Sequence, residues 1–185
     1  APDAAPLREQ YIDTSPFDWI NGENRLALDM ACYDLMGKKL GVPAWKLIGP
    51  QVRQWIPVAA WTVAQEPAAM AEEVRQASAR GYHWIKYHVD EMQDVIAQTA
   101  AMQEAAPLHF RVHYDFNANS NYYTMRPILD ELCKFSVAGR FEDVVQGTDE
   151  DAYRMLREQC PLPIIGHHVP PEAMTRRYID GMMAG

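Results

Sequence analysis

A chain of 185 residues with 48% hydrophobic content is long enough to bury a core, so a purely disordered segment is excluded. Its net charge of -8, with 17 basic against 25 acidic residues spread along the chain, provides no basic stripe for a phosphate backbone, which argues against a nucleic-acid partner. No apolar run approaches the roughly 20 residues that span a bilayer, and the first residues lack the features of a signal peptide, so we expect a soluble, cytoplasmic protein without a membrane partner.

The first part of the chain predicts one helix after a segment without periodicity. Residues 1–20 are rich in Pro, Asp and Ala and show no sustained repeat. From Asn24 onward, apolar side chains recur at helical spacing, and Gly37, Gly41 and Pro43 mark the end of this helix.

From residue 55 onward, apolar β-rich runs alternate with amphipathic helices, a pattern typical of repeated βα units and a parallel sheet. The expected strands cover residues 55–61, 82–89, 108–116, about 140–145, and 162–167. The expected helices run from Pro67 to Gly81, from a cap at Asp90 to Pro107, over residues 124–137, after a capping box of Thr148 and Asp151, and from about Pro171.

Five such units leave two architectures open. A closed eight-stranded barrel typically needs about 250 residues, so three further units would be missing. Five parallel strands also suit an open doubly wound sheet of flavodoxin type, and length alone favours that choice. However, the segment after Trp61 reads Thr62-Val63-Ala64-Gln65-Glu66 and contains no glycine-rich phosphate loop. The polar residues at the strand ends must therefore decide between the two.

Strands two and three end in polar residues, where the reactive groups of α/β folds lie. The two-residue period of a strand puts Lys86 and His88 on one face, as a candidate acid–base pair. The same period puts Asp115 and Asn117 on one face of strand three, together with His113. We regard His113 as a core or lumen histidine and do not include it among the candidate site residues.

The ends of strands four and five can add metal ligands. Glu142 and Asp143 must face opposite sides, and only one of His167 and His168 can point inward. Neighbouring strands lie about 4.7–4.9 Å apart, so side chains from adjacent strands can share an ion. Asp115 and Glu142 are 27 positions apart and Glu142 and His168 are 26 apart, each about one βα unit. This recurring spacing favours a metal site of Asp115, Glu142 and His168.

Several short segments occur in a characteristic order. Residues 31–43 read ACYDLMGKKLGVP and residues 46–49 read KLIG. They are followed by Gly81-Tyr82, Arg111-x-x-x-Asp115-x-Asn117, Phe141-Glu142-Asp143 and Pro163-Ile164. Over residues 24 to 170, this series resembles the mandelate racemase and muconate lactonizing branch of the enolase superfamily.

The resemblance implies an α/β fold, a partial (β/α)8 TIM barrel of about five βα units preceded by a helical piece of the capping domain. Residues 1–50 would be the C-terminal remnant of the capping domain with the helix that leads into the barrel. Residues 51–185 would form the first part of the barrel, so we expect a piece of a longer protein.

The same resemblance implies Mg²⁺ as cofactor, held by Asp115, Glu142 and a third ligand. Counting from Pro163 places that third ligand at His168, where the family usually has a carboxylate. Imidazole suits zinc, iron or nickel better than magnesium, so another divalent metal is an alternative.

The implied reaction is removal of the proton α to a carboxylate, with the ion as Lewis acid for the enediolate. It would dehydrate or racemise a hydroxy acid such as a sugar acid. Lys86 and His88 occupy the base strand, and Asn117 the polar neighbourhood of the metal; His88 stands where the family usually has lysine, and histidine can serve as a base. The expected partners are a small carboxylate substrate and further copies of the chain in a homo-oligomer. The alternatives are a non-catalytic relative that binds ligand or self-assembles, and an open flavodoxin-like binding domain.

Overall fold

The computed structural model describes residues 26–89 and 94–167 of the chain. The chain divides into two compact units, Ala1–Ile56 and Pro57–Gly185, which we describe separately. The first unit contains helix α2 (Leu26–Leu40) and the short helix α3 (Trp45–Ile48). Gly41 follows α2 with φ +66°, the left-handed conformation that glycine adopts without strain, and this confirms the predicted end of the helix. The assignment of residues 1–50 to a capping domain stays a prediction.

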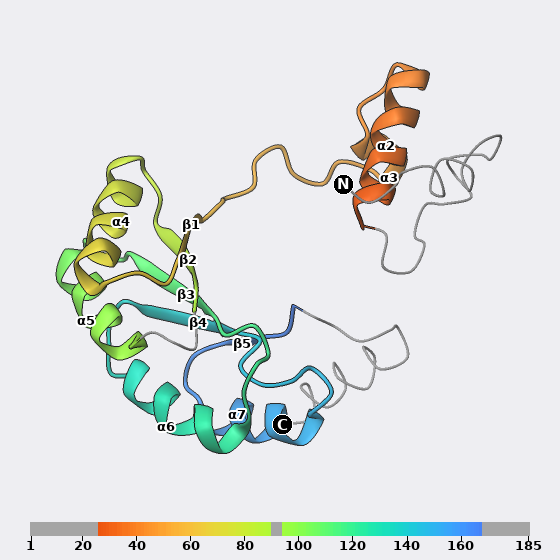
Figure 1. The fold of residues 1–185 in the computed structure, drawn as a ribbon. Coiled ribbons are helices and arrows are strands. Elements are labelled where there is room, and N and C mark those ends of the chain that lie inside the picture. Colours follow the sequence, from red (N-terminus) through yellow and green to blue (C-terminus); the bar gives the residue numbers. More distant parts are fainter. Residues whose placement is uncertain (1–25, 90–93, 168–185) are drawn as a thin grey trace, which may run out of the picture. The chain divides into compact units, whose positions relative to one another are not determined.

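Five parallel strands form one sheet in the second unit, in the order β1-β2-β3-β4-β5 (Figure 1). The strands are β1 (Ala60–Val63), β2 (Trp84–His88), β3 (Arg111–Asp115), β4 (Ala138–Glu142) and β5 (Ile164–Ile165). Each strand pairs in parallel with the next strand along the chain.

The helices of the second unit follow the strands in turn. They are α4 (Pro67–Ala79), α5 (Val95–Ala105), α6 (Tyr122–Leu132) and α7 (Glu150–Gln159). Each helix packs against the next one along the chain, and all four lie along the same side of the sheet (Figure 1). A flavodoxin-like sheet has strand order 2-1-3-4-5 and helices on both faces, so that alternative is wrong. The arrangement confirms the predicted partial (β/α) barrel. The helix expected from Pro171 lies outside the described residues.

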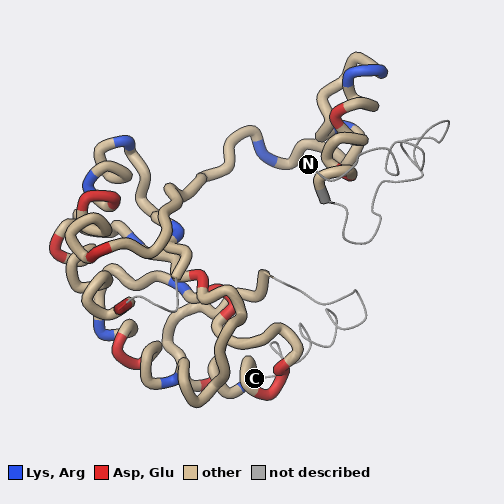
Figure 2. Tube along the Cα trace, viewed as in Figure 1, with Lys and Arg blue, Asp and Glu red and all other residues tan. Residues whose placement is uncertain are grey.

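The core lies between the sheet and these helices. Alternate residues of the strands are fully buried in it, among them Ile85, Tyr87, Val112, Tyr114 and Phe141. Helix residues such as Met70, Val74, Met102, Leu129 and Leu156 complete it. Along the trace of the helices, Lys and Arg are interspersed with Asp and Glu (Figure 2). Since successive strand residues point to opposite faces, the residues between the core positions face away from the helices.

The first strand is shorter than predicted. It begins at Ala60, whereas the apolar pattern suggested residues 55–61. Trp55 and Ile56 are 89% and 72% exposed, and Pro57 has no backbone N–H to donate to a strand ladder. The apolar run of residues 55–58 is therefore not part of the sheet.

The helix caps also differ from the prediction. Helix α5 is capped by Asp94 rather than Asp90, because the Asp94 side chain accepts hydrogen bonds from the backbone N–H groups of the first helical turn. Helix α7 is capped by Asp149, so the predicted capping box of Thr148 and Asp151 is wrong. Strand β4 ends at Glu142, before the predicted residue 145, because Asp143 takes a left-handed conformation with φ +48°.

No helix in the described ranges is long and apolar enough to cross a bilayer.

The three cysteines are free thiols, and Cys133 and Cys160, at the ends of α6 and α7, have sulfur atoms 3.9 Å apart. Helices α6 and α7 therefore contact each other at their C-terminal ends.

Candidate functional site

Two rows of polar side chains lie on the face of the sheet that points away from the helices. The strand pairing places His88, Asp115 and Glu142 side by side in what we call the upper row, at the carboxyl ends of their strands. Two residues earlier on each strand stand Lys86, His113 and Arg140, the lower row. The upper row thus joins two carboxylates to an imidazole, and the lower row places basic groups beneath them.

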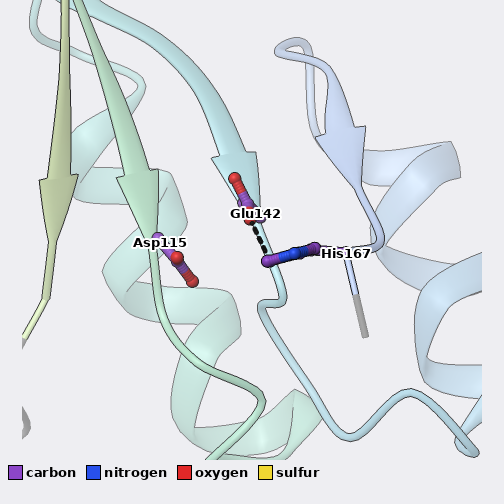
Figure 3. A group of neighbouring side chains, drawn as sticks. All are labelled: Asp115, Glu142 and His167. Atoms are coloured by element: carbon purple, nitrogen blue, oxygen red, sulfur yellow. Dashed lines mark ion pairs between the residues drawn. The ribbon is translucent and has the colours of Figure 1, made fainter. Parts of the chain in front are cut away.

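Three side chains form a group that fits a divalent cation. Asp115, Glu142 and His167 each offer one ligand atom, and these atoms all lie within 4.8 Å of one another (Figure 3). Asp115 and Glu142 are the last residues of β3 and β4, and His167 follows β5 by two residues. Both carboxylates are buried, and His167 is exposed. Carboxylate oxygens and imidazole nitrogen are common ligands of divalent cations, so the donor set suits such an ion.

The third ligand in this group is His167, whereas the sequence predicted its neighbour His168. His168, the ligand predicted from the sequence, lies outside the described residues. Ile165 pairs with Glu142, so the two-residue period brings His167 to the same face, and its Nδ1 lies 3.0 Å from Oε1 of Glu142. The backbone N–H of His167 also donates to Oδ1 of the buried Asp143 at 2.7 Å. In the sequence, the spacing of two residues between Ile165 and His167 indicates that both face the same side of the sheet.

Lys86 connects the two carboxylates. Its Nζ lies 2.9 Å from Oδ2 of Asp115 and 2.9 Å from Oε1 of Glu142. Burial lowers the pKa of Lys86, but the hydrogen bonds to Glu142 and Asp115 outweigh burial and raise it. Burial raises the pKa of Asp115, but the hydrogen bonds from Lys86 and from the backbone N–H of Asn117 outweigh that effect and lower it. At neutral pH, Lys86 is therefore a cation and Asp115 an anion.

His88 and Asn117 lie beside the carboxylates at the same end of the sheet. Nδ1 of His88 is 3.5 Å from Nδ2 of Asn117, and the backbone N–H of Asn117 donates to Oδ1 of Asp115 at 3.0 Å. On its other side, the ring of His88 lies 6.3 Å from the exposed ring of Trp61, measured between centroids. His88 is thus half-buried between an aromatic ring and an amide.

His113 is a site neighbour that the sequence interpretation left out. Its side chain is buried, and Nε2 lies 2.5 Å from Oε2 of Glu142. Burial and the nearby guanidinium of Arg140 lower the pKa of His113, so its imidazole is neutral at pH 7. Arg140 itself lies over the ring of Trp84, 4.7 Å from the ring centroid. The sequence feature that indicates its place in the site is its position two residues before Asp115, which puts both side chains on the same face of β3.

Comparison with known proteins finds a matching family and several similar proteins. Residues 69–177 match the family described as enolase C-terminal domain-like. An N-succinyl-L-Arg/Lys racemase from Bacillus cereus is 28% identical over 143 residues, which cover 76% of this chain and 38% of that protein. A D-galactonate dehydratase from Variovorax paradoxus is 26% identical over 115 residues, covering 57% of this chain and 30% of that protein.

A similar solved structure is that of the 3,6-anhydro-D-galactonate cycloisomerase from Zobellia galactanivorans. It has a TM-score of 0.74 and 25% identity, and the match covers 84% of this chain and 44% of that chain. The chain thus spans less than half the length of these relatives.

Proposed function

Because this chain belongs to the mandelate racemase and muconate lactonizing branch of the enolase superfamily, we propose that the protein removes the proton α to the carboxylate of a small hydroxy acid. Racemisation or dehydration would follow. The observation that carries the proposal is the convergence of Asp115, Glu142 and His167, with ligand atoms within 4.8 Å of one another, next to His88. A racemase and a dehydratase among the similar proteins support this class of chemistry.

A divalent cation held by Asp115, Glu142 and His167 would supply a Lewis acid for the substrate carboxylate. Two carboxylates suit Mg²⁺, whereas the imidazole of His167 also suits Mn²⁺ or Zn²⁺. Lys86 offsets one of the two carboxylate charges from 2.9 Å away. Two carboxylates and one ammonium group leave a single net negative charge, so a bound divalent ion would make the site positive and attractive to an anion.

His88 is the proposed base. Imidazole is the side chain that most often transfers protons in enzymes, and His88 stands in the upper row directly beside Asp115. Asn117 and Trp61 lie on two sides of its ring and restrict its orientation. Lys86, which stays protonated, contributes positive charge near the negative charge that develops on the substrate.

A sugar acid is the proposed substrate. The support is similarity to a D-galactonate dehydratase at 26% identity and to a 3,6-anhydro-D-galactonate cycloisomerase at 25% identity. Hydroxy acids of this kind carry the carboxylate and the acidic α C–H bond that the site is proposed to act on.

Exchange of the α-proton with solvent tests the proposal. The intact protein is incubated in D₂O with Mg²⁺ or Mn²⁺ and a panel of sugar acids, and loss of the α-proton signal is followed by ¹H NMR. We expect exchange with the wild type, none with His88→Gln, and unchanged exchange with the control His83→Gln, an exposed residue just before β2. Binding without exchange would favour the non-catalytic alternative, and exchange that survives Asp115→Asn would contradict the proposed site.

A further inference from the structure

The two carboxylate oxygens of Glu142 have different neighbours. Oε1 lies 2.9 Å from Nζ of Lys86 and 3.0 Å from Nδ1 of His167, on the side of the proposed cation site. Oε2 lies 2.5 Å from Nε2 of His113, on the side of the lower row. The carboxylate is thus turned so that one oxygen faces the cation site and the other faces His113.

We propose that His113 is a positioning residue that holds Glu142 in this orientation, an inference that rests on the proposed function. Within the described part of the chain, its buried Nε2 has no well-aligned hydrogen bond and points to Oε2 of Glu142. The backbone pairing of His113 with Arg140 puts its imidazole one step below Glu142, where it reaches the carboxylate diagonally.

The neighbours of His113 leave its imidazole little freedom. On β2 it pairs with Lys86, and on β4 with Arg140, whose guanidinium is occupied by the ring of Trp84. With a side chain only 8% exposed, His113 cannot turn to water for another partner. A second oxygen held in this way leaves Oε1 as the ligand atom of Glu142. Groups that orient a metal ligand typically account for about 10- to 100-fold in metal affinity.

Two polar substitutions test this role without placing an apolar group under the site. The amide of Gln reaches about as far as Nε2 of histidine, whereas the amide of Asn is one methylene shorter. In the intact protein, titrated with Mn²⁺ by calorimetry, His113→Gln should bind within about threefold of wild type, and His113→Asn should bind at least about 10-fold more weakly. Val112→Ala is the structural control, because Val112 is a fully buried neighbour in the helix-facing core and should lower the melting temperature but not Mn²⁺ affinity.

The outcomes separate this inference from the proposed site. Equal Mn²⁺ affinity of the wild type, His113→Gln and His113→Asn would overturn the role of His113 while leaving the cation site intact. Weaker binding by His113→Gln and Val112→Ala to the same extent would show a general structural effect and would also overturn it. Absence of Mn²⁺ binding in the wild type, or unchanged binding in Glu142→Gln, would overturn the cation site and with it the role of His113.

Discussion

The ammonium group of Lys86 lies 2.9 Å from Oδ2 of Asp115, and its side chain is only 24% exposed. It contacts Glu142 at the same distance, so one cation neutralises part of the charge of two buried carboxylates. We expect Lys86→Met to destabilise the metal-free protein by about 3 kcal/mol, because a buried ion pair loses one partner. Urea unfolding in the presence of a chelator measures this loss.

Divalent cation should reverse part of the loss in Lys86→Met, because it supplies positive charge to the same carboxylates. The matched control is Lys134→Met. Lys134 pairs with Glu131, which is 53% exposed, so loss of this ion pair should lower the free energy of unfolding by less than about 0.5 kcal/mol. Equal and small effects of the two substitutions would contradict the interpretation of Lys86 as the charge partner of the site.

The two adjacent histidines after β5 can be separated by single substitutions. His167→Ala should weaken Mn²⁺ binding by more than about 10-fold, because the Nδ1 of His167 lies in the group of ligand atoms. His168→Ala should leave binding unchanged. Calorimetry with Mn²⁺ and Mg²⁺ should also show tighter binding of Mn²⁺ by the wild type, since imidazole suits Mn²⁺ better. The opposite order of the two alanine variants would favour the ligand predicted from the sequence.

The buried hydroxyl of Tyr114 predicts a loss of stability at alkaline pH. Burial raises the pKa of Tyr114 well above its ordinary value of 10.0, so the folded protein keeps the proton that the unfolded chain releases. The free energy of unfolding should therefore fall as the pH rises above about 10. Tyr114→Phe should flatten this part of the profile, at a cost of about 1 kcal/mol at pH 7 for the lost contact with Thr99.

Urea unfolding between pH 8 and pH 11 measures the effect of Tyr114→Phe. Tyr123, which is 84% exposed, provides the control, and Tyr123→Phe should leave the wild-type profile unchanged. Parallel profiles for wild type and Tyr114→Phe would show that Tyr114 does not drive the alkaline loss.

The start of α7 offers a comparison of two aspartates that stand two residues apart, Asp149 at the N-cap and Asp151 in the first turn. Asp149 caps the helix by accepting a hydrogen bond from the backbone N–H of Ala152, and Asp149→Ala should cost about 1 kcal/mol. Asp151 is paired with Arg154 at the surface, and its replacement by alanine should cost less than about 0.5 kcal/mol. Thermal unfolding ranks the two variants, and the reverse ranking would support the capping box suggested by the sequence.

Gly139 gives a prediction about packing at the start of β4. A Cβ atom at this position would overlap the ring of Trp84, so Gly139→Ala should cost about 1–3 kcal/mol. Gly49→Ala is the control, because no atom would lie within 4 Å of its Cβ and its φ of 172° is ordinary extended backbone. A melting temperature for Gly139→Ala equal to that of Gly49→Ala would mean that the Trp84 ring can move aside.

The features that sequence predicted well are those with a local physical cause. The shared face of Lys86 and His88 follows from the two-residue period of one strand, and the structure keeps both on the face opposite Tyr87. The βα units follow from apolar periodicity, which each segment carries by itself. Strand order does not have a local cause, so periodicity alone left the choice between a partial barrel and a doubly wound sheet open. The family resemblance predicted the partial barrel, and the strand pairing confirmed it.

The third cation ligand and the helix caps show why the rest was harder. Which of His167 and His168 faces Glu142 depends on the register of β5 against β4, which the sheet sets rather than the residues themselves. At α7, Asp149, Glu150 and Asp151 are consecutive acidic residues. Asp149 is the cap because the helix begins at Glu150, which a local sequence pattern does not determine. The exposed apolar residues at 55 and 56 resemble a strand locally, but Pro57 interrupts the ladder.

Strand β5 contributes only two residues to the sheet and joins β4 through the pairs Phe141–Ile164 and Glu142–Ile165. A cation shared by Asp115, Glu142 and His167 would tether three strands at the point where this ladder is shortest. Part of the free energy of ion binding would then oppose local opening of β5. The concentration of free ion would thereby govern how often this strand detaches from its neighbour.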